Sequence, residues 1–419
     1  MNTPETKRPK ATNGSIERNE ESPMTTTGRI LRPAMGLALA LGLALGVGCS
    51  STPVVEEPEP EPELTEIEKI SEETGMSVEA LEMFEEALAR MDEDDLLEAS
   101  ELLAEVVEKE PYFAEAHYNL GLVYGDIEQH DLAVIHIEQA RDLDPDVFDY
   151  TIAMAKAHAE AEEYEDARRL FNEVIRQEPG NLTAINNLAV ISLREGDEAQ
   201  ALEYVEQILR EDNDNVGALN TLGLIYMERE NISLARFVLG RALEQDETNP
   251  DVHNNMGLVY LQDENVPSAV SHFNQAVDAD PNYLESRLNL GSILIEYLDY
   301  DRANAHFSHV MELTPENCVA NLGKGATSFA LGEPESARDR FEYYLEMCDG
   351  DHYSSHERLA ELNEGPLNNP AQAIEHYEAL LALSTDEDDQ AQYEAEINFL
   401  QSQMDRQAEP DEAEEESEE

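Results

Sequence analysis

Cysteine and histidine are the side chains in this 419-residue chain that could carry nucleophilic, redox or metal chemistry, and both are scarce. There are three cysteines, Cys49, Cys318 and Cys348, and the last two stand 30 residues apart. The sequence contains no glycine-rich phosphate loop, no G-x-S-x-G elbow and no aspartate–glycine metal loop. We therefore predict that the chain is not an enzyme, has no catalytic residues and takes no cofactor or small-molecule substrate.

Two pairs of histidines have the spacing of metal ligands on one helix face. His352 and His356 stand four residues apart, and His306 and His309 stand three apart. No H-E-x-x-H pattern and no nearby cysteine accompanies either pair. We interpret these histidines as surface or packing residues and predict no metal site.

Charge limits the partners of this chain. Its formal net charge is −67, with 93 Asp and Glu residues against 26 Lys and Arg. Such a chain repels nucleic-acid phosphates and an anionic membrane surface, so we predict that it binds no nucleic acid. The excess of acidic residues over lysine resembles proteins of salt-adapted bacteria, and a merely acidic, soluble surface is the alternative.

The N-terminal residues are typical of an export signal. An apolar run at 33–48 follows two arginines and ends at Cys49. This pattern predicts a signal peptide over residues 1–48, with translation starting at Met24. The small residues before the cysteine resemble the bacterial lipobox, which implies that Cys49 is lipidated and becomes the new N-terminus. A plain secretory signal or an uncleaved anchor is the alternative.

Two further segments differ from the body of the chain. Residues 49–64 are rich in Pro and Glu, which predicts an extended spacer after the lipidated cysteine. Residues 406–419 predict a disordered acidic tail, which either solubilises the chain or serves as a docking peptide. Because the chain repels anionic lipids, any membrane attachment must come from the lipid anchor alone.

A period of 34 residues organises the rest of the chain. Eight alanines recur at this spacing, at Ala99, Ala133, Ala167, Ala201, Ala235, Ala269, Ala303 and Ala337. An apolar residue follows each alanine by four positions, Gly or Ala precedes it by twelve, and Pro often follows it by twelve. Small residues let two helices cross closely and Pro ends a helix, so the period predicts antiparallel helical hairpins.

These columns resemble the tetratricopeptide repeat, a helix-turn-helix unit of this period. The resemblance implies an all-α superhelical solenoid over residues 80–385, with about nine repeats. We expect the repeats to begin near residues 80, 114, 148, 182, 216, 250, 284, 318 and 352. Residues 65–79 and 386–405 would then cap the two ends.

The resemblance also implies where a partner binds. In this family the first helices of the repeats line a concave wall. The wall positions hold amide and apolar side chains, at Asn119, Asn186, Asn187, Asn220, Asn254, Asn255, Asn289, Tyr118, Leu224 and Leu258. Amides can pair with the N–H and C=O groups of an extended peptide, which predicts a peptide-binding groove. That Asn is simply common at these positions is the alternative.

The repeat also brings Cys318 and Cys348 together. They are positions one and thirty-one of one repeat, and the start of the first helix lies beside the end of the second in an antiparallel hairpin. We therefore expect a disulfide in an exported chain, with two free thiols as the alternative.

These features predict a lipid-anchored scaffold on the periplasmic side of the outer membrane, with the inner membrane as the alternative. It would bind neutral or basic protein segments and assemble an envelope machine. The lipoproteins that the chain resembles act in gliding motility and in type IV pilus assembly. The alternatives are a docking module for peptidoglycan-remodelling enzymes and a periplasmic chaperone or substrate-delivery protein.

Overall fold

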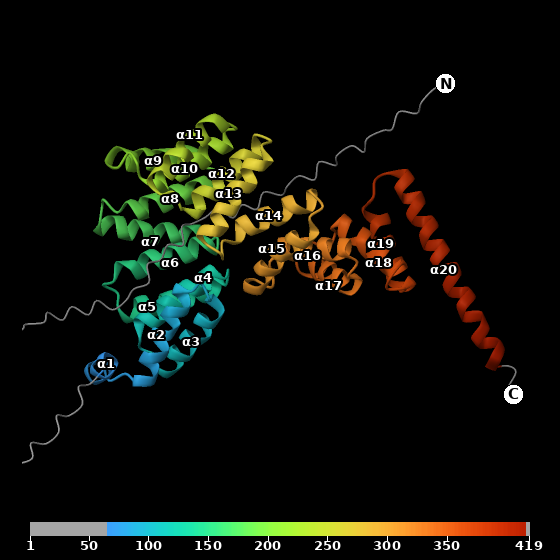
Figure 1. Cartoon of the computed structure of the whole chain (residues 1–419), viewed down its shortest axis with the longest axis horizontal. Helices are drawn as coiled ribbons and strands as arrows, with labels where there is room; N and C mark the ends of the chain where they lie inside the picture. The colour runs from blue at the N-terminus through green and yellow to red at the C-terminus, as the bar shows by residue number, and fades with distance from the viewer. Residues whose placement is uncertain (1–64, 416–419) are drawn as a thin grey trace, which may run out of the picture. The chain divides into compact units, whose positions relative to one another are not determined.

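The computed structural model describes residues 65–415, so the export signal, Cys49 and the spacer at 49–64 lie outside the described residues. Every regular element in the described range is a helix (Figure 1). These residues fall into two compact units. Unit 1 is Ile185–Leu290, and unit 2 contains the described residues of Thr26–Ala184 and Gly291–Glu419.

Unit 1 consists of helices that pair as antiparallel hairpins. Its helices are most of α8 (Leu182–Arg194), α9 (Glu198–Glu211), α10 (Val216–Glu228), α11 (Ile232–Gln245), α12 (Pro250–Gln262), α13 (Val266–Ala279) and the first half of α14 (Leu284–Glu296).

Unit 2 has the same construction. Its helices are α1 (Glu66–Thr74), α2 (Val78–Asp92), α3 (Leu96–Lys109), α4 (Ala114–Asp126), α5 (His130–Leu143), α6 (Phe148–Glu160), α7 (Tyr164–Gln177), the second half of α14, α15 (Tyr300–Leu313), α16 (Cys318–Leu331), α17 (Pro334–Met347), α18 (Tyr353–Glu364), α19 (Pro370–Leu383) and α20 (Glu387–Glu415).

The helix starts follow the 34-residue period. The first helices of seven hairpins, from α4 to α16, begin at the residues expected from the sequence. Only the terminal hairpins are displaced, because α2 begins at Val78 rather than residue 80 and α18 begins at Tyr353 rather than residue 352.

Asn and Asp side chains set many of these starts. Asn215, Asn249 and Asn317 precede α10, α12 and α16, and each side chain accepts a hydrogen bond from the backbone N–H three residues later. Asp or Asn does the same before six of the second helices. Such caps satisfy N–H groups that have no partner inside the helix, and each contributes about 1 kcal/mol.

The core lies between the two helices of each hairpin and between neighbouring hairpins. All eight periodic alanines are 0% exposed. At Gly257 a Cβ atom would stand 2.5 Å from the ring of Phe273, so only glycine lets α12 approach the aromatic side chain of α13 this closely. The small residues of the period are therefore packing requirements.

The C-terminal helix differs from the expectation. Tyr393, Ile397 and Leu400 of α20 pack into a cluster with residues of α19, as a capping helix should. The helix then continues to Glu415, so residues 406–415, expected to belong to a disordered tail, are helical. Their Ala, Glu, Gln and Arg residues favour helix, whereas Pro410 opposes it. Among residues 65–415, no helix combines the length and the apolar character needed to cross a membrane.

Candidate functional site

The first helices of unit 1 carry a row of polar side chains that hydrogen-bond from each repeat to the next. We name as the amide row Asn186, Asn220, Thr221, Asn254, Asn255 and Asn289. Three bonds of the same kind connect its members: Thr221 Oγ1 donates to Asn186 Oδ1 at 3.0 Å, Asn255 Nδ2 to Asn220 Oδ1 at 2.9 Å, and Asn289 Nδ2 to Asn254 Oδ1 at 3.2 Å.

The spacing of these bonds follows from the repeat. Each bond joins residues 35 apart, which is one period plus one residue. The acceptor is therefore the fifth residue of one first helix, and the donor is the sixth residue of the next. Each bond between neutral groups contributes about 1 kcal/mol to stability. The amides that we expected to serve a partner thus also connect neighbouring repeats.

Burial fixes the orientation of these amides. Asn255, Asn254 and Asn220 are 1%, 3% and 5% exposed, whereas Asn186 and Asn289 are half-buried. Ser286 Oγ also donates to Asn254 Oδ1 at 3.0 Å, so that oxygen accepts two hydrogen bonds. An amide whose oxygen is held in this way cannot rotate freely, so the amide row is preorganised.

The row still has groups to offer a partner. Asn186 and Asn289 are half-buried, so a partner can reach them, whereas Asn220 and Asn254 are 5% and 3% exposed and serve the bonds between repeats. Leu224 and Leu258 are half-buried and stand four residues after Asn220 and Asn254, which places them on the same helix faces. Half-buried amides on α8 and α14 therefore accompany half-buried leucines on α10 and α12.

A buried pair lies at the start of the same helices. Tyr283 donates its phenol hydrogen to Asp251 Oδ1 at 3.0 Å, and both residues are buried. Burial, with the carboxylate of Asp251, raises the pKa of Tyr283 well above its ordinary value. The phenol therefore stays neutral and donates to the carboxylate throughout the physiological range.

Tyr118 and Asn119 lie on α4 of unit 2. The rings of Tyr118 and Tyr150 have centroids 4.9 Å apart, and burial, with the carboxylate of Asp149, raises the pKa of Tyr118 to about 12. Asn119 is 0% exposed and its Nδ2 donates to the Glu115 carbonyl of its own helix. Asn187 of unit 1 is likewise buried, at 3% exposed. Asn119 and Asn187 are thus interior residues, and the accessible part of the expected groove is smaller than its sequence positions imply.

Cys318 and Cys348 are joined by a disulfide in this structure, with Cα atoms 5.9 Å apart. Cys318 is the first residue of α16, and Cys348 directly follows α17. The bridge therefore closes one hairpin at its open end.

The closely spaced histidines His352 and His356 make separate contacts. His352 caps α18, where its side chain accepts from the Ser355 backbone N–H. His356 instead faces His376, with the two Nδ1 atoms 3.1 Å apart. Spacing within one helix does not reveal this pair, because the two residues belong to α18 and α19. Between residues 65 and 415, no group of three or more His, Cys, Asp or Glu side chains is arranged to hold a metal ion.

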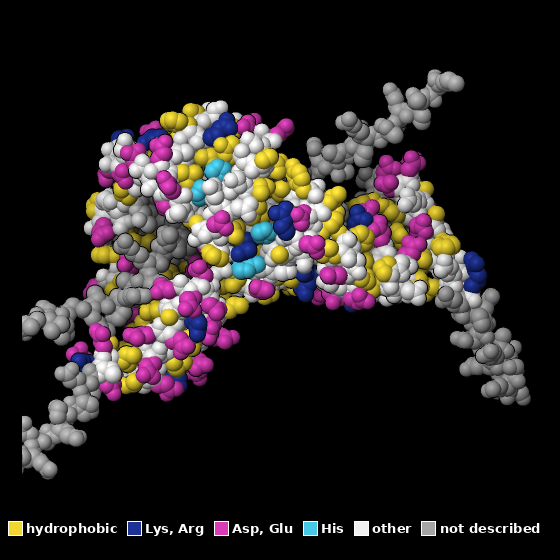
Figure 2. Space-filling model, in the orientation of Figure 1, with side chains coloured by type: hydrophobic (Ala, Val, Ile, Leu, Met, Phe, Trp, Pro, Cys, Tyr) yellow, Lys and Arg dark blue, Asp and Glu magenta, His cyan; other side chains and the backbone are white. Residues whose placement is uncertain are grey.

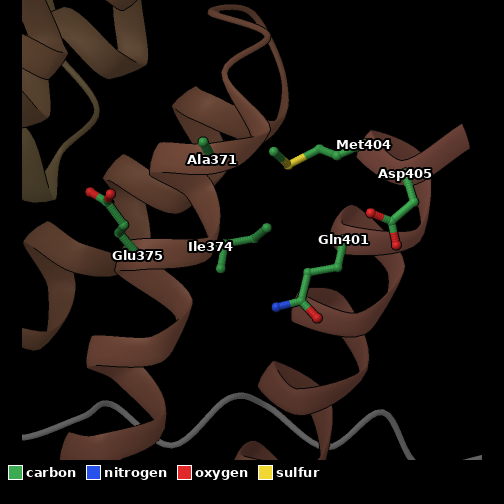
Figure 3. Close-up of a pocket in the computed structure, with 6 residues that line it drawn as sticks. All are labelled: Ala371, Ile374, Glu375, Gln401, Met404 and Asp405. Atoms are coloured by element: carbon green, nitrogen blue, oxygen red, sulfur yellow. The ribbon is translucent and has the colours of Figure 1, made fainter. Parts of the chain in front are cut away.

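A shallow hollow of about 340 Å³ lies between α19 and α20 (Figure 3). It is lined by Ala371, Ile374, Glu375, Gln401, Met404 and Asp405. Figure 3 shows Glu375 and Asp405 on opposite sides of the hollow, and no Ser, Cys or His lines it.

Comparison with known proteins agrees with the repeat assignment. A family model described as tetratricopeptide repeat matches residues 192–257, and a second model with the same description matches residues 84–147 and 152–216. No curated protein matches the chain.

Several solved structures are similar to this chain. The structure described as the APC/C hetero-tetramer Cut9–Hcn1 has a TM-score of 0.52 and 15% identity, over 74% of this chain and 59% of that chain. A structure of Pseudomonas aeruginosa pilF has a TM-score of 0.46 and 19% identity, over 51% of this chain and 97% of that chain. PilW, described as a widely conserved type IV pilus biogenesis factor, has a TM-score of 0.42 and 22% identity, over 50% of this chain and 97% of that chain.

These likenesses concern the fold. The period, the buried alanine column, the paired helices and the two family models agree on one architecture. Residues 84–147 and 152–257 carry tetratricopeptide repeats, and the fold of the described residues is an all-helical repeat solenoid.

Proposed function

We propose that this chain is a lipid-anchored scaffold that holds an extended segment of another envelope protein along the amide row. Tetratricopeptide repeats generally bind protein partners. The observation that carries the proposal is the row itself. Its half-buried members Asn186 and Asn289 are held by Thr221 and Asn254, and half-buried Leu224 and Leu258 lie on the first helices between them.

The two kinds of group contribute differently to binding. Completing the burial of a half-buried leucine stabilises a complex by about 1 kcal/mol, so the aliphatic side chains supply affinity. An amide donor paired with a partner carbonyl adds about 1 kcal/mol or less, because it replaces a bond to water. Since the amides are already ordered, little side-chain entropy is lost when they bind. The amides therefore fix the register of the segment, and the leucines hold it.

Charge selects the partner. The chain carries a net charge of −67, and on the face that Figure 2 shows, Asp and Glu side chains gather over α2 and α3. A neutral or basic segment approaches such a surface without repulsion, and a basic one is attracted over a Debye length of about 10 Å. Capture should therefore weaken as salt rises.

The anchor belongs to the same proposal. The sequence supports lipidation at Cys49, a spacer at 49–64 and a periplasm-facing position on the outer membrane. By its resemblance to known lipoproteins, the scaffold serves an envelope machine such as a gliding-motility or a type IV pilus-like complex. Acyl label should appear on the wild-type chain and vanish from Cys49→Ala. An unlabelled wild-type chain would remove the anchor from the proposal.

Partner capture tests the binding role. Leu224→Ser with Leu258→Ser should reduce the amount of protein crosslinked to the chain in cells by tenfold or more. Leu234→Ser is the matched control, because Leu234 is a leucine of unit 1 that is already 41% exposed on α11. Equal capture by both variants, with both folded by circular dichroism, would contradict the proposal.

The phenotype of a deletion strain separates the possible machines. Loss of motility supports the gliding or pilus assignment. Altered cell shape supports docking of peptidoglycan enzymes instead, and loss of exported proteins supports a chaperone role.

A further inference from the structure

Three repeats contain a pair of histidines with the same geometry. Each pair joins the first and second helices of one hairpin, and in all three the Nδ1 atoms are 3.1 Å apart: His117 and His136, His253 and His272, and His356 and His376.

A second contact defines the state of each pair. Nε2 of the first-helix histidine lies 2.9–3.2 Å from a backbone carbonyl six residues earlier, at Pro111, Glu247 and Gly350. A carbonyl oxygen can only accept, so Nε2 carries the hydrogen and the neutral ring presents its Nδ1 lone pair to the second histidine. Histidines that bind metals are oriented by a bond of this kind.

We propose that each pair is a binding site for one divalent transition-metal ion, Cu²⁺, Ni²⁺ or Zn²⁺, with the two Nδ1 atoms as ligands. With metal–nitrogen bonds of about 2.0–2.1 Å, the 3.1 Å separation corresponds to an N–metal–N angle of about 100°. That angle lies between the square-planar value of roughly 90° and the tetrahedral value of roughly 109°. Imidazole is a preferred ligand of all three ions.

Protons balance without a co-reactant. In the metal-free pair, the second-helix histidine donates its Nδ1 hydrogen to the first. On binding, that hydrogen moves to Nε2 of the second-helix ring, which leaves both Nδ1 lone pairs for the ion and both rings neutral. His136, His272 and His376 are half-buried, so an ion can reach them, and water completes the coordination.

Another hairpin provides a natural comparison. At the corresponding positions of α16 and α17, Asn321 Nδ2 donates to the Pro315 carbonyl at 2.8 Å, and Arg340 Nη1 donates to Asn321 Oδ1 at 3.2 Å. This Asn–Arg pair makes the same two contacts, to a carbonyl and to its partner, without an imidazole. The hydrogen bonds alone therefore do not require histidine, whereas the Asn–Arg pair lacks the two imidazole nitrogens that would bind the metal.

The comparison gives a matched variant. His117→Asn with His136→Arg transfers the Asn–Arg pair to α4 and α5, so it should keep the fold and lose one metal site. His136→Gln is a second variant, which removes a single ligand and leaves the carbonyl contact of His117 intact. His158→Asn is the control, because His158 has no histidine partner and bonds to Glu163 at 2.5 Å.

The experiment is a Cu²⁺ titration of the full chain in excess Mg²⁺, followed by equilibrium dialysis and electron paramagnetic resonance. Mg²⁺ prefers oxygen ligands, so it occupies the many carboxylates and leaves imidazole sites to copper. We expect three nitrogen-coordinated Cu²⁺ ions per chain, two in each pair variant and three in the control. The proposal would be overturned if excess Mg²⁺ displaced the bound Cu²⁺. It would also be overturned if both pair variants were folded and still bound three nitrogen-coordinated Cu²⁺ ions.

Discussion

Asn255 Nδ2 donates a hydrogen bond to Asn220 Oδ1 at 2.9 Å, and the two side chains are only 1% and 5% exposed. The bond joins α10 to α12, the first helices of consecutive repeats. Because neither amide can turn to water, loss of one partner leaves a buried polar atom unsatisfied.

Asn255→Ala should therefore lower the free energy of unfolding by about 1–2 kcal/mol. Asn274→Ala, at an exposed site on α13, should change it by less than about 0.5 kcal/mol. A double-mutant cycle with Asn220→Ala should give a coupling energy of about 1 kcal/mol in urea unfolding. Additive effects of the two substitutions would show that the bond does not form in solution.

The same substitution at two glycines should have opposite effects. Gly332 has φ of +77°, a conformation that strains any other residue, so Gly332→Ala should destabilise the chain by about 1 kcal/mol. Gly240 lies inside α11, where an added Cβ meets no atom within 4 Å, so Gly240→Ala should stabilise by about 1 kcal/mol. Thermal unfolding measures both, and shifts of the same sign would contradict the backbone assignment.

The Cys318–Cys348 disulfide should restrict the unfolded chain. It closes a loop with a sequence separation of 30, so Cys318→Ala with Cys348→Ala should lower the free energy of unfolding by about 3 kcal/mol. A reductant should destabilise the wild-type chain by a similar amount and leave the double variant unchanged. Wild-type stability that does not respond to a strong reductant would indicate free thiols.

Tyr118 should make the fold sensitive to alkali. Its pKa is raised to about 12, so between pH 10 and 12 the unfolded chain has lost this proton while the folded chain keeps it. Below pH 10 Tyr118 is protonated in both states and does not change the free energy of unfolding. As the pH rises from 10 to 12, the free energy of unfolding falls. Between pH 9 and pH 11.5, the free energy of unfolding measured in urea should fall by on the order of 2 kcal/mol less in Tyr118→Phe than in the wild-type chain. Tyr112→Phe is the control, because Tyr112 is 86% exposed, and an equal loss in both variants would assign the effect elsewhere.

The repeat was predictable because its constraints lie within one period. Ala269 and Gly257 stand twelve residues apart in the sequence. Ala269 is fully buried on α13, and Gly257 lets α12 approach the ring of Phe273. A spacing of this kind can be read directly from the chain, and the helix starts followed from it. Cys318 and Cys348 were brought together by the same hairpin geometry.

Contacts between side chains of different helices were harder to predict. Asn220 and Asn255 stand 35 residues apart in sequence, yet they bond because each first helix lies beside the next. His356 stands four residues from His352 on its own helix, yet its partner is His376 on α19. Both signals exist in the sequence, but they become visible only when the repeats are aligned with one another.

The central claim is that a partner segment lies along the amide row. A photo-crosslinking residue placed at Leu258, one helical turn after Asn254 on α12, tests it most directly in cells. Phe237 of α11, 63% exposed in the same unit, is the comparison site. We predict that the probe at Leu258 crosslinks to one envelope protein and that the probe at Phe237 does not. Crosslinks to that protein from Phe237 alone, or equally from both sites, would contradict it.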